Sequence, residues 1–460
     1  MKTILKNGTI ILPDETIVAD LCIEGGIITK IQKDLCDDAA QYIDVTGKLI
    51  LAGAIDSHTH LDLDVGATKT ADDFYTGTRA AVAGGTTTII DFATQAKGHS
   101  LKEALEEWKE KANKGTFCDY SFHMAITDWN EATKKEMTDM INEGVSSFKM
   151  YMAYKGSLQT DDGAIYEALN ESKEIGGLIG FHCENGDLIH ARIQENLAKG
   201  HTHPYYHKMT RPDLIEVEAI NRIATMSKLT GAKAWVVHLS TSEGLKVIRE
   251  ANQSGACLVA ETCPQYLLLD DSLYGHPDDG SFEAAKYIMS PPLRDKSNQE
   301  PLWQGLKDGS IAFISTDHCA FNFKGQKELG INDYSKIPNG AMGLEHRLRL
   351  MYTYGVCTGK LTINEMTKLL SYNPAKQFGL ENKGSIEVGK DADLVILDPK
   401  GQETITFKTQ VQDVDYTPYE GFNTTGIIET VFLRGEKVVD HGQVVKTQVK
   451  GMYQPRKPIR

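Results

Sequence analysis

Short hydrophobic runs recur along the whole chain, and the segments between them divide it into three parts. Residues 1–50 alternate apolar and polar positions over a few residues at a time, which predicts short β-strands. The same pattern returns in residues 384–445. The pairs Asn7-Gly8 and Gly25-Gly26 lie where two-residue hairpin turns are expected. Both ends of the chain are therefore predicted to be rich in strands.

In the middle of the chain, apolar runs alternate with helical patterns. One helix is expected after Ser100, which has capping-box spacing to Glu103, and another begins at residue 242. The expected strands lie in LAGAIDSHTHL (51–61), TTTIIDFAT (86–94), DYSFHMAIT (119–127), SSFKMYMAY (146–154), GLIGFHCEN (177–185), AKAWVVHLST (232–241), CLVAETCPQYL (257–267) and IAFISTDHC (311–319). About eight strands that alternate with helices predict a parallel sheet closed into a (β/α)₈ barrel.

This α/β organisation suggests four segments. Residues 1–50 and 381–445 form the β-rich ends, and residues 51–380 form the barrel. Residues 446–460 are basic and contain prolines, so we expect them to lie over a surface rather than in a core.

Composition and charge narrow the class of protein. The chain has 460 residues and a formal net charge of −14, from 49 Lys+Arg against 63 Asp+Glu. This sign argues against a nucleic-acid partner. No apolar run approaches the roughly 18 residues of a membrane span, and the first residues do not resemble a signal peptide. The eight cysteines form no CxxC pair, so we expect reduced thiols in the cytoplasm.

Histidines and one aspartate lie at the carboxyl ends of several predicted strands. They are His58, His60, His182, His238 and Asp317. Such strand ends converge on the active site of (β/α)₈ enzymes. Neutral imidazole and carboxylate suit Zn²⁺, Mn²⁺ or Fe²⁺, and the set exceeds what one tetrahedral ion needs. The sequence therefore predicts two divalent metal ions.

The tripeptide His-Thr-His occurs twice, but only one copy lies in a strand pattern. His58 and His60 share one face of a strand, because side chains alternate with a period of two. His201 follows a helical stretch and His203 precedes a proline. We therefore expect this second pair to lie in a solvated loop and to bind no metal.

The fourth predicted strand carries Lys149 at the position where an anionic group would be expected to bridge the two ions. Two neighbouring cations repel each other, and a bridging anion reduces that repulsion. A protonated lysine is a poor metal ligand. Reaction of its amine with CO₂ would produce a carbamate that can bridge two ions. A buried ion-pair partner and a Schiff-base lysine are the alternatives that the residue pattern leaves open.

Taken together, these motifs resemble those of the cyclic amidases of the amidohydrolase superfamily, the dihydropyrimidinases and hydantoinases. They occur in order over nearly the whole chain, as GAIDSHTHL, AGGTTTIIDF, SSFKMYMAYKG, HCENGD, VVHLST, ETCPQYL, KYIMSPPLR, STDHC, FNFKGQKELG, IPNGAMGLEHR, KGSIEVGKDADLVILDP and TPYEGF. The resemblance implies that both chain ends build one small β-sandwich. It also implies an N6-carboxylated Lys149 and metal ligation by His58, His60, His182, His238 and Asp317.

The resemblance further implies how a small cyclic amide is bound and opened. Tyr154 is expected to donate a hydrogen bond to the oxyanion, although it could also be a core residue. Ser290 and Asn339 are expected to hold the ring amide through their main chains, although Pro-Asn-Gly is also a common turn. Asp317 is expected to move the proton while the ring opens to an N-carbamoyl amino acid. Relatives are commonly tetrameric, so the tail 446–460 is expected at a subunit interface.

Several alternatives remain within and beyond this family. Dihydroorotase has an arginine two positions after its His-x-His motif, where this chain has Asp62. An allantoinase, and a non-enzymatic scaffold relative that has lost its ligands, are the other candidates. Dihydropyrimidinase and hydantoinase differ mainly around the ring substituent. The residues expected there are Leu63, Val65, Tyr151 and Leu158. Tyr151 and Leu158 replace the phenylalanine common in D-hydantoinases, so a preference for bulky aromatic substituents is not indicated.

Overall fold

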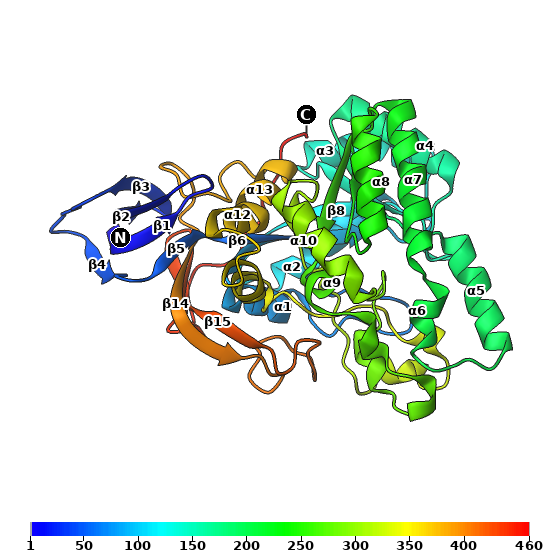
Figure 1. Cartoon of the computed structure of the whole chain (residues 1–460). Coiled ribbons are helices and arrows are strands. Elements are labelled where there is room, and N and C mark those ends of the chain that lie inside the picture. Colours follow the sequence, from blue (N-terminus) through cyan, green and yellow to red (C-terminus); the bar gives the residue numbers. More distant parts are fainter. Residues whose placement is uncertain (1, 460) are drawn as a thin grey trace.

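A barrel of eight parallel strands forms the centre of the protein in the computed structural model, which describes residues 2–459 (Figure 1). The strands are β6 (Ala54–Thr59), β7 (Thr86–Thr94), β8 (Asp119–Ala125), β9 (Ser147–Tyr151), β10 (Leu178–His182), β11 (Ala234–Val236), β12 (Leu258–Thr262) and β13 (Phe313–Ile314). The first and last strands meet where the His60 N–H donates to the His318 carbonyl at 2.8 Å. The predicted barrel is confirmed, and each predicted run contains one barrel strand.

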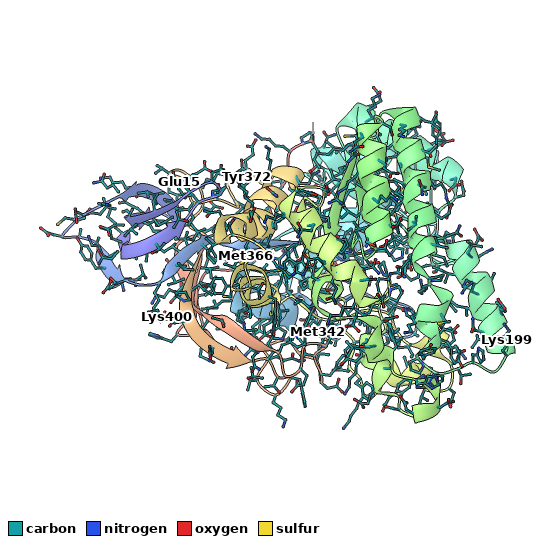
Figure 2. All side chains as sticks on the ribbon, in the orientation of Figure 1. Glu15, Lys199, Met342, Met366, Tyr372 and Lys400 are labelled. Atoms are coloured by element: carbon teal, nitrogen blue, oxygen red, sulfur yellow. The ribbon has the colours of Figure 1, made fainter. Side chains whose placement is uncertain are left out.

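Helices surround the barrel, and side chains fill the space between them (Figure 2). They are α1 (Phe74–Ala83), α2 (Leu101–Asn113), α3 (Glu131–Asn142), α4 (Asp162–Ile175), α5 (Gly186–Ala198), α6 (Tyr206–Thr210), α7 (Asp213–Thr230), α8 (Ser242–Gln253), α9 (Pro264–Leu268), α10 (Gln299–Lys307), α11 (Arg347–Met351), α12 (Ile363–Thr367) and α13 (Asn373–Phe378). The capping box of Ser100 and Glu103 is present at the start of α2. None of the helices within residues 2–459 has both the length and the apolar content that a membrane crossing requires.

The two chain ends form a second, mostly antiparallel sheet of nine strands. Its strands are β1 (Lys2–Ile11), β2 (Thr16–Glu24), β3 (Ile27–Gln32), β4 (Gln41–Asp44), β5 (Leu49–Ala52), β14 (Leu394–Thr404), β15 (Asn423–Leu433), β16 (Glu436–Asp440) and β17 (Gln443–Val444). Pairing of β5 with β14 joins the two ends of the chain. The sheet has its own core cluster, which includes Leu5, Ile50 and Phe432.

One of the two predicted hairpin turns is wrong. Gly25-Gly26 does connect β2 to β3, with both φ angles positive at 63° and 86°. Asn7-Gly8 instead lies inside β1, where the register with β2 shifts at a bulge. The side chain of Asp20 accepts the Asn7 N–H at 2.9 Å, so the chain continues straight instead of turning.

An ionic cluster joins the second sheet to the barrel. The buried Lys383 ammonium lies 2.5 Å from Asp119 at the start of β8, and 2.7 Å from both Asp391 and Asp393. Arg434 also pairs with Asp119. Three carboxylates this close could hold a cation, and here the lysine takes that place.

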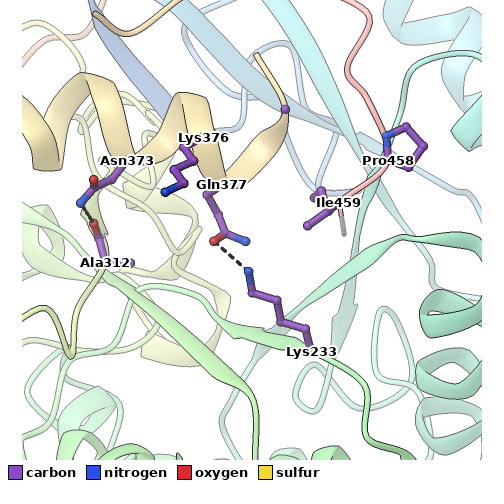
Figure 3. Close-up of a pocket in the computed structure, with 8 residues that line it drawn as sticks. Lys233, Ala312, Asn373, Lys376, Gln377, Pro458 and Ile459 are labelled. Carbon is purple, nitrogen blue, oxygen red and sulfur yellow. Dashed lines mark hydrogen bonds between the residues drawn. The ribbon is translucent and has the colours of Figure 1, made fainter. Parts of the chain in front are cut away.

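The C-terminal tail closes the amino-terminal end of the barrel. Arg456 is buried and donates to the hydroxyls of Ser121 (2.9 Å) and Ser147 (2.7 Å) and to the carbonyl of Phe122. Pro458 and Ile459 continue along the rim of a nearby cavity of about 340 Å³ that Lys233 and Gln377 also line (Figure 3).

The expectation that this tail lies over a surface is therefore wrong for Arg456, which lies in the barrel interior. The acceptors of Arg456 come from β8 and β9, which are far away in sequence. A local sequence pattern therefore could not predict these hydrogen bonds. Contact of the tail with a neighbouring subunit stays a prediction.

Candidate active site

The predicted metal ligands lie together at the carboxyl end of the barrel. His58 lies near the end of β6, His60 directly follows that strand, and His182 ends β10. His238 follows β11 and Asp317 follows β13. The four imidazoles are buried, and the Asp317 side chain is 15% exposed. This placement follows from parallel strands, whose carboxyl ends share one rim of the barrel.

Two imidazoles and one carboxylate form a first group of possible ligands. Oδ1 of Asp317 lies 3.0 Å from Nε2 of His58 and 3.4 Å from Nε2 of His60. These three side chains offer atoms that all lie within 4.8 Å of one another. Nζ of Lys149, on β9, is 2.9 Å from Nε2 of His58. The group can surround one divalent ion, with Lys149 at its edge.

A second group consists of His182 and His238. Nδ1 of His182 lies 2.9 Å from Nε2 of His238. The ring of His238 is 5.5 Å from that of His58, so this group adjoins the first. Glu184 accepts from Nε2 of His182 at 2.8 Å, which leaves a lone pair on Nδ1. Two imidazole nitrogens directed at one small volume suit a second cation.

Buried carboxylates that the sequence analysis missed orient these rings. Glu261, in β12, accepts from Nδ1 of His58 at 2.5 Å and from the His238 N–H at 3.1 Å. Arg211 donates to Glu184 at 3.0 Å. Such partners set the tautomer and direction of metal-binding histidines. An acidic residue inside the apolar run 257–267 was the available signal for Glu261.

Burial lowers the pKa of three of the four imidazoles and of Lys149, whereas at His58 the carboxylates of Asp317 and Glu261 outweigh burial and raise the pKa. Burial lowers the pKa of His60 to about 3 and also lowers the pKa of both His182 and His238, so these rings are neutral near pH 7. Burial lowers the pKa of Lys149 to about 8. Three neutral imidazoles, a carboxylate and a lysine whose pKa is lowered towards neutrality fit a site for divalent cations.

Three residues of the site have a left-handed backbone. The φ angles of Tyr154, His238 and Asp317 are 67°, 40° and 52°. Such conformations are costly for residues other than glycine and cluster at functional sites. All three residues lie just after barrel strands, β9, β11 and β13, at the end of the barrel that holds the predicted ligands.

The residues expected to bind the substrate ring lie beside His182. The ring of Tyr154 is 5.1 Å from the ring of His182. Burial raises the pKa of the Tyr154 phenol, and the nearby Ser290 hydroxyl opposes this shift. The Ser290 hydroxyl donates to the side-chain oxygen of Asn339 at 3.2 Å. The fold therefore brings Tyr154, Ser290 and Asn339 together beside the predicted ligand His182.

The residues expected around the ring substituent differ in exposure. Tyr151, at the end of β9, is buried, and its ring lies 6.1 Å from that of Tyr154. Leu158 lies in the turn that follows, and its main-chain N–H donates to the Tyr154 carbonyl at 3.2 Å. Leu63 packs on the barrel core, and Val65 is 44% exposed. Of these four residues, Tyr151 is therefore the one whose ring lies beside Tyr154 in the site.

The second His-Thr-His copy has other partners. His201 stacks on Tyr206 with ring centroids 4.1 Å apart and lies 3.0 Å from the side-chain oxygen of Asn196. His203 is bonded to the Ser281 carbonyl at 2.7 Å. These contacts hold both rings within the loop between α5 and α6.

Residues 49–438 match the model of the Amidohydrolase family. A D-hydantoinase of Geobacillus stearothermophilus is 44% identical over 99% of this chain and 97% of its own. The crystal structure of a dihydropyrimidinase from Brevibacillus agri covers 100% of both chains with a TM-score of 0.98 at 43% identity. An L-hydantoinase (dihydropyrimidinase) from Arthrobacter aurescens covers 99% of both chains with a TM-score of 0.88 at 29% identity.

Proposed function

The chain belongs to the amidohydrolase family, and we propose that it opens the cyclic amide bond of dihydropyrimidines, 5-substituted hydantoins or both. The products are N-carbamoyl amino acids. The observation that carries this proposal is the convergence of four buried imidazoles, Lys149 and Asp317 beside Tyr154. Relatives named for both enantiomers share the fold, so the fold alone does not set enantioselectivity.

We propose two divalent ions, with Zn²⁺ as the first choice and Mn²⁺ as the alternative. His58, His60 and Asp317 would hold one ion, and His182 and His238 would hold the other. Lys149 would join them as N6-carboxylysine, formed with CO₂, because a carbamate adds the negative charge that two cations require. When bound, the ions supply Lewis acidity and a water that ionises near neutral pH.

The side chains divide the remaining work. Asp317 would accept the proton of the attacking water and return it to the leaving amide nitrogen. Tyr154 would donate a hydrogen bond to the oxyanion, and its raised pKa keeps the phenol protonated for this role. Ser290 and Asn339 would hold the ring amide through their main chains. Tyr151, Leu63, Val65 and Leu158 would face the ring substituent.

The alternatives are less well supported. Asp62 would repel the carboxylate of dihydroorotate, and a scaffold without activity would not require a complete ligand set.

We place the enzyme in the cytoplasm as a homotetramer. Sedimentation velocity measures the subunit number directly.

Purified protein is expected to open dihydrouracil, 5-substituted hydantoins or both, and to contain two metal ions per chain. The measurement is loss of the ring amide absorbance, with metal content determined on the same sample. Dihydroorotate and allantoin are the matched controls. Turnover confined to either control, or a fully metal-loaded protein that opens none of these rings, would refute the proposed activity.

The variant Tyr154→Phe is expected to lower kcat by roughly 10²-fold with a much smaller change in KM, because a donor to the oxyanion acts mainly in the transition state. The ring and its packing remain, so metal content should equal that of the wild type. Steady-state kinetics with both substrate classes measures the effect. A rise in KM alone would make Tyr154 a ground-state binding residue, and no change would make it a packing residue.

A further inference from the structure

Lys327 is a fully buried lysine, and within residues 2–459 each hydrogen bond of its ammonium goes to a neutral carbonyl oxygen. It begins the 3₁₀ segment η5 (Lys327–Gly330). Its Nζ donates to the carbonyls of Ile288 (2.7 Å), Pro338 (2.7 Å) and Gly340 (2.8 Å). No carboxylate within residues 2–459 lies at ion-pair distance from it, and burial lowers its pKa to about 7. A buried cation without a counter-charge is destabilising, so these three carbonyls must replace its hydration.

The three carbonyls belong to two segments that meet above Lys327. The first segment, residues 287–291, contains Ser290, and the second segment, residues 338–340, contains Asn339. The Gly340 N–H donates to the Ile288 carbonyl at 3.0 Å, which ties the segments together. A Cβ at Gly340 would lie only 2.2 Å from the Cys319 carbonyl oxygen, so this close approach requires glycine. Lys327 is thus the common anchor of both segments.

In the first segment, side chains bind the carbonyls on both sides of Ser290. The pairs are Tyr274 Oη with Tyr287 O (3.2 Å), Lys327 Nζ with Ile288 O (2.7 Å), His207 Nε2 with Met289 O (2.8 Å) and Tyr266 Oη with Pro291 O (2.8 Å). The main-chain N–H and C=O of Ser290 make no hydrogen bond within the described chain, although Ser290 is only 7% exposed. Buried main-chain groups are normally paired. Ser290 therefore has unpaired main-chain groups, although the carbonyls of the residues on both sides of it are hydrogen-bonded.

The second segment repeats this arrangement. Lys327 binds the carbonyls of Pro338 and Gly340, which lie on either side of Asn339. Across residues 2–459, the main-chain N–H and C=O of Asn339 also find no partner. One ammonium thus binds both neighbours of Asn339 and the carbonyl of Ile288, two residues before Ser290, while His207 and Tyr266 bind the carbonyls directly beside Ser290.

We propose that Lys327 is a positioning residue for the substrate, which holds the two segments so that the main-chain groups of Ser290 and Asn339 stay available to the ring amide. This inference rests on the proposed function. A peptide group without a partner gains by rotating towards one, and bonds to the adjacent carbonyls prevent that rotation. Acceptors and donors held in place before the substrate arrives lower the cost of binding it.

The test is Lys327→Met, which keeps much of the side-chain volume and removes all three donors. KM for the preferred cyclic amide is expected to rise roughly tenfold or more while kcat changes by less than about threefold, because the lost function is ground-state positioning. Metal content should equal that of the wild type, since Lys327 contacts no metal ligand. Lys327→Gln restores two N–H donors on a shorter side chain, so its KM should lie between those of Lys327→Met and the wild type.

Arg456→Met is the matched control, because Arg456 is also a buried cation, at the opposite end of the barrel, whose hydrogen bonds in the described part of the chain all go to neutral oxygens. It should lower Tm and leave KM unchanged. An unchanged KM in metal-loaded Lys327→Met, or an equal KM rise in Arg456→Met, overturns the positioning role. If Lys327→Met fails to fold, the KM of Lys327→Gln decides by the same criterion. Wild-type protein that opens no cyclic amide overturns the proposed function itself, which is a distinct outcome.

Discussion

The variants His58→Ala and His60→Ala are expected to abolish ring opening and to lower the bound metal below two ions per chain. Each removes a nitrogen that lies within 3.4 Å of Oδ1 of Asp317 in the first ligand group. Loss of Lewis acidity forfeits several kcal/mol of transition-state stabilisation, so activity should fall by roughly 10³-fold or more. Steady-state kinetics and metal analysis of the same preparations measure both effects.

The matched control is His201→Ala, from the second His-Thr-His copy. Its ring stacks on Tyr206 and bonds Asn196 at a distance from the barrel strands, so activity and metal content should stay near wild type. A large loss in His201→Ala together with tolerance of His60→Ala would reverse the assignment of the metal site.

The variant Lys149→Ala is expected to lose metal and activity together. Nζ of Lys149 lies 2.9 Å from Nε2 of His58, and burial lowers its pKa to about 8, which leaves an appreciable neutral fraction to react with CO₂. Without the carbamate, two cations lack their shared anion. Acetate or propionate should partly restore metal and turnover, because a small carboxylate fits the space that alanine leaves.

Lys149→Met separates the loss of the carbamate from the loss of packing. Methionine fills the space beside Phe92 and Tyr151 but cannot be carboxylated, so acetate should fail to rescue it. Equal rescue of both variants would mean that the acid does not occupy the position of the carbamate. A structure with both ions bound beside an unmodified Lys149 ammonium would end the carbamate hypothesis.

Much of the fold was determined by local patterns in the sequence. The eight apolar runs each contain one barrel strand, because a buried strand needs a short continuous apolar segment. Convergence of His58, His182, His238 and Asp317 also followed from the sequence. Carboxyl ends of parallel strands must share one rim once the barrel closes, so residues at those ends could be brought together without knowledge of any contact.

Only the tertiary structure decided how these residues are supported. Asn7-Gly8 has the composition of a turn, yet Asp20 holds it inside a strand. Arg456 belongs to a basic tail, yet serines from two distant strands draw it into the barrel.

The same holds for the groups that orient the site. Glu261 on β12 accepts from His58 on β6, and Lys327 binds carbonyls from two separate loops. Periodicity reports which face of an element is buried, and it is a local property. Hydrogen bonds between buried polar groups depend on which distant segments become neighbours. The sequence therefore determined the barrel and where the predicted ligands lie, whereas the folded chain alone decided which partners hold them in place.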